Sequence, residues 1–162
     1  MRRLCIPALV AFSLAIAAGP VSADQVYHTE RLTLDPVGRA AGSGMVVNIH
    51  PNGPQRYAIE QYQLRHGEPR SSYQVYLHLY LDDGATCQDP GTPASLPTAV
   101  IKTNGAGNGT AQLVLTPENI AEAGLLAGMS FPIDWTLSQI TTPNEADWPT
   151  THKTDCTIVT LD

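Results

Sequence analysis

Apolar and polar residues alternate along most of the chain after its first 23 residues. The alternation is strongest in residues 71–82, SSYQVYLHLYLD. A period of two places successive side chains on opposite faces of a β-strand. The sequence therefore predicts a strand whose core-facing side carries every second residue, namely Tyr73, Val75, Leu77, Leu79 and Leu81.

Weaker alternation elsewhere predicts further short strands separated by turns. The segments are 26–34, 40–50, 55–65, the two halves of 99–115, 130–140 and 156–162. Asp, Asn, Pro and Gly, which favour chain reversals, separate them at DPVG (35–38), PNGP (51–54) and NGAGNG (104–109). Because its pattern is weaker, 55–65 is predicted to be an edge strand.

In three of these predicted strands, the alternation indicates which residues share one face. In 40–50 one face carries Ala41, Met45, Val47 and Ile49. In 55–65, Ala58, Tyr62 and Leu64 share one side with the charged Arg56 and Glu60. In 130–140 the residues expected to face the core are Phe131, Ile133, Trp135 and Leu137.

One short helix is predicted within residues 116–129. Thr116 can cap it, Pro117 suits its first position, and Gly124 or Gly128 can end it.

The remaining segments, 82–98 and 141–155, are rich in turn residues and are predicted to be long loops. About seven to eight short strands with a single short helix are typical of an all-β, antiparallel β-sandwich. The sandwich is expected to be immunoglobulin-like or closed into a small barrel.

The first 23 residues are typical of a secretory signal peptide. Arg2 and Arg3 precede an apolar run, and small residues end the segment at Ala23. The run is shorter than the ~20 apolar residues that a membrane-spanning helix needs. We therefore expect cleavage after Ala23, no transmembrane segment in the mature chain, a single domain over 24–162, and a secreted or periplasmic location.

Two cysteines, Cys87 and Cys156, remain after that cleavage. In an exported chain such a pair predicts a disulfide bond. The formal net charge is −6, and no segment gathers Lys or Arg. A nucleic-acid partner is not expected, because such proteins carry a basic patch that neutralises phosphates.

The run EPRSSYQVYL, with Pro69, Tyr73 and Val75, resembles the P-x-x-x-Y-x-V pattern of fibronectin type III and related immunoglobulin-like strands. The resemblance implies that the Tyr73 hydroxyl turns back to the chain at a corner. It implies architecture only, because such sandwiches host many functions. The TNGAGNG hairpin and the closing C-x-x-V-x-L-D are also similar to exported bacterial β-sandwich domains of unassigned function.

The polar side of the 71–82 strand is the first candidate site. Gln74, Tyr76, His78 and Tyr80 form a stripe, too aromatic for plain solvent and too polar for a core. As a platform, the rings can stack on a sugar or peptide while His78 and Gln74 donate hydrogen bonds. As structure, the same stripe lies beneath a loop or in a dimer contact.

Metal binding is a second hypothesis. His28, His50, His66, His78 and His152 form no H-x-H, H-x-x-H or H-E-x-x-H spacing. His50 and His66 flank turns and His152 lies in a predicted loop, so we expect these three to be exposed. A copper or zinc site assembled from separate strands would draw on His78 and His50.

A hydrolase is the third hypothesis. Ser43 lacks the G-x-S-x-G frame. No cofactor-binding motif is present, and no cofactor is expected. The sequence thus predicts an exported, non-catalytic binding or envelope-structural module for an unknown ligand, of protein or carbohydrate kind. The alternative is a small periplasmic metal-binding protein.

Overall fold

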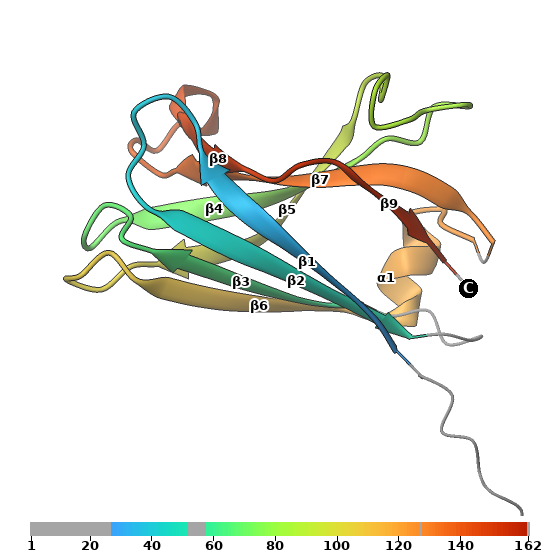
Figure 1. Cartoon of the computed structure of the whole chain (residues 1–162), viewed down its shortest axis with the longest axis horizontal. Coiled ribbons are helices and arrows are strands. Elements are labelled where there is room, and N and C mark those ends of the chain that lie inside the picture. Colours follow the sequence, from blue (N-terminus) through green and yellow to red (C-terminus); the bar gives the residue numbers. More distant parts are fainter. Residues whose placement is uncertain (1–26, 52–57, 127, 162) are drawn as a thin grey trace, which may run out of the picture.

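The computed structural model describes residues 27–51, 58–126 and 128–161. The predicted signal peptide, its cleavage site after Ala23 and the PNGP turn beyond Pro51 lie outside these ranges. Within them the chain forms nine strands, one α-helix and one 3-10 helix (Figure 1). These are β1 (Tyr27–Pro36), β2 (Ser43–Pro51), β3 (Ala58–Arg65), β4 (Ser72–Leu79), β5 (Ala94–Lys102), β6 (Gly109–Leu115), α1 (Pro117–Glu122), β7 (Ser130–Gln139), the 3-10 helix (Glu145–Asp147), β8 (Thr150–Lys153) and β9 (Thr157–Thr160).

The strands are paired antiparallel in the order β5-β4-β7-β8-β1-β2-β3-β6, with β9 also paired to β7. They form two facing layers, one of β1, β2, β3 and β6, the other of β4, β5, β7, β8 and β9 (Figure 1). β1 joins the layers, because it pairs with β2 along most of its length and with β8 at Asp35 and Pro36. The result is the predicted antiparallel β-sandwich, nearly closed into a barrel.

The core lies between the layers, and two strands supply much of it. In β4, Val75, Leu77 and Leu79 are buried as predicted, whereas Leu81 follows the end of the strand and is 41% exposed. In β7 all four predicted residues are buried. Leu34, Val46, Leu64 and Ile101 add to this core from other strands.

The predicted position of 55–65 at an edge is wrong. This segment is β3, which lies between β2 and β6. Its inward side carries Ala58, Glu60, Tyr62 and Leu64, all buried. The burial of a carboxyl residue on that side weakened the apolar pattern of an interior strand.

The apolar face seen in 40–50 turns outward. Met45, Val47 and Ile49 are half-buried on the outer side of β2, while Val46, Asn48 and His50 point between the layers and are buried. The exterior of this layer is therefore more apolar, and its interior more polar, than alternation alone indicates.

The two predicted long loops contain parts of strands. β8 lies within 141–155, where Thr151 and His152 are buried. β5 begins at Ala94, inside the predicted 82–98 loop. β8 has four residues, and none of them is Val, Ile or Leu. Hydrophobic alternation therefore could not predict this strand.

The helix begins where predicted. Thr116 Oγ1 accepts from the Asn119 backbone N–H at 3.3 Å, and Asn119 Oδ1 accepts from Thr116 N at 3.2 Å. This reciprocal cap satisfies two donors at the helix start. Ile120 is the buried residue of this six-residue helix. In Figure 1, α1 lies between the diverging ends of the two layers.

The predicted disulfide is present. Cys87 and Cys156 are bonded, with Cα atoms 5.5 Å apart, and join the loop after β4 to the start of β9. The predicted corner is present too, because the Tyr73 hydroxyl accepts from the Glu68 backbone N–H at 2.9 Å. None of the helices in the described ranges has the length and apolar character needed to cross a membrane.

Candidate functional site

The predicted Gln74–Tyr80 stripe lies on the outer face of β4 and just beyond its end. Gln74 Nε2 donates to the carbonyls of Val75 and Ala99, at 3.0 and 3.1 Å. The rings of Tyr76 and His78 are stacked with centroids 6.5 Å apart. The structure therefore brings Gln74, Tyr76 and His78 onto one surface.

The polar ends of both tyrosines are already bonded within the chain. Tyr80 is buried and its hydroxyl donates to Asp134 Oδ2 at 2.8 Å. The Tyr76 hydroxyl donates to Glu145, in the loop between β7 and β8. Burial, followed by the nearby carboxylate, raises the pKa of each tyrosine to about 12. These contacts favour a structural role, and ligand binding by the stripe stays a prediction.

His78 lies between two hydroxyl groups. Nδ1 is 2.7 Å from Ser95 Oγ, and Nε2 is 2.9 Å from Thr136 Oγ1. Burial lowers the pKa of His78, against the opposing effect of Asp134. A neutral imidazole fits this setting, since it donates to one hydroxyl and accepts from the other.

Ser95, His78 and Asp134 are the serine, histidine and acid that a hydrolase would need. The geometry is not that of a triad, in which the acid accepts a hydrogen bond from the imidazole and orients it. Here hydroxyls face both ring nitrogens, and Asp134 accepts from Tyr80 instead.

The two histidines considered for metal binding lie on opposite sides of β4. His50 is buried between the layers and lines a cavity with Leu77 and Leu79, whereas His78 is on the outer face. The expected exposure of His50 and His152 is wrong: His152 is fully buried, with Nδ1 3.0 Å from Thr151 Oγ1. His66 is exposed as expected.

Within the described ranges, no three His, Cys, Asp or Glu side chains gather in a group that could hold a metal ion. The side chain of His28 is not among those that the structure describes.

A buried polar cluster surrounds Glu60, which is 1% exposed. Its carboxyl group accepts from Asn48 Nδ2 at 3.3 Å, from Trp135 Nε1 at 3.1 Å and from the Tyr62 hydroxyl. Burial raises the pKa of Glu60, and the three hydrogen bonds oppose that rise. The Tyr62 hydroxyl oxygen also lies 2.9 Å from Thr98 Oγ1, which links this cluster to β5.

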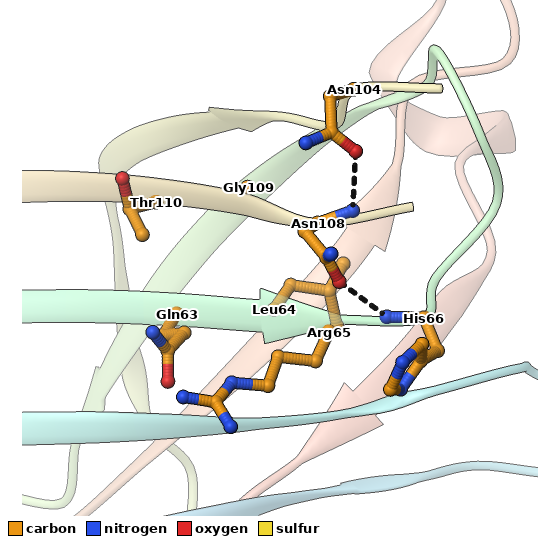
Figure 2. A pocket seen from close by; sticks show the side chains of 8 residues that line it. All are labelled: Gln63, Leu64, Arg65, His66, Asn104, Asn108, Gly109 and Thr110. Atoms are coloured by element: carbon orange, nitrogen blue, oxygen red, sulfur yellow. Dashed lines mark hydrogen bonds between the residues drawn. The ribbon is translucent and has the colours of Figure 1, made fainter. Parts of the chain in front are cut away.

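A groove of about 540 Å³ lies between the end of β3 and the β5–β6 hairpin (Figure 2). It is lined by Gln63, Leu64, Arg65, His66, Asn104, Asn108, Gly109 and Thr110. Among these lining residues there is no carboxylate. Arg65 contributes a guanidinium group to this lining.

Both asparagines of the groove are held with their oxygens turned to the backbone. Asn108 Oδ1 accepts from His66 N at 3.1 Å, and Asn104 Oδ1 accepts from Ala106 N and Asn108 N at 2.9 and 3.1 Å (Figure 2). A backbone N–H can only donate, so the atom facing it must be the amide oxygen. The Nδ2 donors of both residues are therefore left for other partners.

The backbone that builds this groove is closely packed. Gly107 has φ +75°, and a Cβ there would lie 2.0 Å from Gly67 O. Gly67 N in turn donates to Gly107 O at 3.0 Å, which ties the hairpin to the loop after β3. His66 in that loop has φ 56°, a left-handed conformation uncommon outside glycine.

Sequence reasoning missed both the Glu60 cluster and the groove. For Glu60 a signal was present, because the residue shares the inward side of its strand with Ala58, Tyr62 and Leu64. For the groove no local signal exists. Arg65 and Asn108 are brought together only because β3 pairs with β6.

Comparisons with protein-family models, with curated proteins and with solved structures gave no match. The function is therefore inferred from the geometry of the chain itself.

Proposed function

We propose that the protein is an exported, non-catalytic binding module whose groove beside the β5–β6 hairpin binds an acidic saccharide. The carrying observation is the set of donors in that groove: the Arg65 guanidinium and two amide groups whose oxygens are already engaged. Such a wall offers hydrogen bonds to an acceptor and provides no carboxylate that would repel one.

The Arg65 guanidinium is the group that favours an oxyanion in this groove. Its planar fork can donate two parallel hydrogen bonds to one carboxylate. The net charge of −6 opposes approach of an anion at long range. At physiological salt that repulsion is screened beyond about 8 Å, so the local cation decides binding at contact.

The remaining polar side chains suit the hydroxyl groups of a sugar. Gln63 and Thr110 lie in the groove beside Arg65 and offer both donors and acceptors. Because the asparagine amides are fixed by backbone hydrogen bonds, little side-chain entropy is lost when they bind.

Glucuronate, with glucose as its neutral match, tests the groove. We expect glucuronate to shift the backbone amide signals of His66 and Asn108 in NMR titrations, and glucose to bind more weakly. Arg65→Gln is expected to weaken glucuronate binding about tenfold, because a charge-assisted hydrogen bond is lost. The matched control is Arg31→Gln, an exposed arginine on β1 outside the groove.

Equal loss of affinity in the Arg65 and Arg31 variants would show that only overall charge matters and would refute the groove as the site. Equal binding of glucuronate and glucose would refute the acidic class of ligand.

Export rests on the predicted signal peptide and is supported by the disulfide, a bond typical of oxidising compartments. The mature protein is expected to begin at Asp24. N-terminal sequencing of protein recovered outside the cytoplasm checks this, and a chain that still starts at Met1 there contradicts it.

A further inference from the structure

A small cavity lies between the layers at the end that α1 closes. Its volume is about 60 Å³. Its apolar walls are Ala58, Leu77, Leu79, Leu115, Ile120, Leu125, Phe131, Ile133, Val159 and Leu161. Asn48, His50 and Glu60 supply polar groups from β2 and β3. The cavity thus combines a large apolar wall with a polar one.

Asn48 has a polar atom that nothing in the described chain satisfies. The residue is 5% exposed, and its Oδ1 is buried without a hydrogen-bond partner, while Nδ2 donates to Glu60 Oε1. If Glu60 instead holds a proton on Oε1, the amide must turn to accept it, and the NH₂ group is then left over. In either state one buried amide atom lacks a partner, which costs about 1–3 kcal/mol.

We propose that this cavity is a binding site for a short-chain alcohol. The hydroxyl group bonds to Asn48, and the alkyl chain lies against Leu77, Leu125 and Val159. A hydroxyl serves both amide orientations, because it is donor and acceptor at once. An anionic head group is excluded, since burying its charge beside the Glu60 carboxyl group is far costlier than burying a hydroxyl.

The volume limits the length of that alcohol. A cavity of ~150 Å³ holds benzene, and a single water needs only ~10–15 Å³. The observed cavity lies between these sizes and suits a chain of about two to four carbons. Water alone would find few hydrogen-bond partners in this cavity, because ten of the lining residues are apolar.

Entry of the alcohol is expected to require displacement of α1. Ile120 and Leu125 line the cavity, and α1 has six residues, too few to be stable without its packing. Displacing this short segment opens the cavity between the two layers, which diverge at this end (Figure 1).

Titration with 1-propanol, followed by methyl NMR, tests the proposal. We expect saturable shifts of the Leu77, Leu125 and Val159 methyl signals, absent with propionate. Leu125→Ala enlarges the cavity and is expected to raise the affinity for 1-hexanol about tenfold over wild type. The matched control is Leu126→Ala, whose side chain is 59% exposed and which should leave binding unchanged.

Two results would overturn the inference. One is a bound water in the cavity with no methyl shifts at saturating 1-propanol. The other is the same 1-hexanol affinity in the Leu125 and Leu126 variants. Because the groove at Arg65 is a separate surface, neither result depends on glucuronate binding there.

Discussion

Replacing Glu60 by alanine is expected to destabilise the fold by about 3–5 kcal/mol. The change removes the acceptor of three buried donors, on Tyr62, Trp135 and Asn48, and leaves a void beside fully buried Trp135. A buried donor that loses its partner costs about 1–3 kcal/mol. Urea unfolding of the two proteins, compared at equal slope, measures the difference.

Glu60→Gln is the matched control, because it keeps the length of the side chain and one acceptor oxygen. We expect it to cost clearly less than the alanine substitution. Equal losses in the two variants would mean that neither the retained volume nor the retained acceptor oxygen of Gln matters, and that the effect comes from the carboxyl group itself.

Wild type and Glu60→Gln are expected to differ in how their stability depends on pH. Burial raises the pKa of Glu60 above its ordinary value of 4.5, so the folded state holds this proton more tightly than the unfolded chain. This contribution to stability is full below about pH 4.5 and falls as pH rises through the raised pKa. Wild type should therefore lose stability relative to Glu60→Gln across that interval.

Removing the disulfide is expected to cost about 4 kcal/mol. Cys87 and Cys156 are 69 positions apart, and closing a loop of that length restricts the unfolded chain by about this amount in the chain-entropy model. The double variant Cys87→Ser, Cys156→Ser, unfolded in urea, measures the loss.

Wild type with a reducing agent should unfold at the same urea concentration as the serine variant. A serine variant as stable as oxidised wild type would show that the bond adds nothing to the fold.

Strands with strong apolar alternation could be predicted from the sequence, and others could not. β4 and β7 carry aliphatic or aromatic residues at every inward position, so their period of two is visible. β8 buries Thr151 and His152, whose side chains do not mark a core position. In β2 the outward face is the more apolar one. Hydrophobicity alone would predict that this face points to the core.

The candidate sites were harder to predict than the strands, because partners distant in the sequence build them. The stripe at Tyr76 could be recognised, since its residues are two positions apart on one strand. Its Glu145 and Ser95 partners could not, because they come from other segments. The groove needs the register that sets Leu64 opposite Gly109, and no local pattern encodes that pairing.

The double pairing of β1 has a consequence for the order of folding. β1, β2 and β3 are neighbours in sequence and can associate before the rest of the chain does. The pairing of β1 with β8, at Asp35 and Lys153, joins segments far apart in the sequence. It cannot form before the C-terminal strands are present. Contacts of such long sequence separation slow folding. Closure of the barrel is thus a late event, so the interior around Glu60 stays open to water until the C-terminal strands have paired.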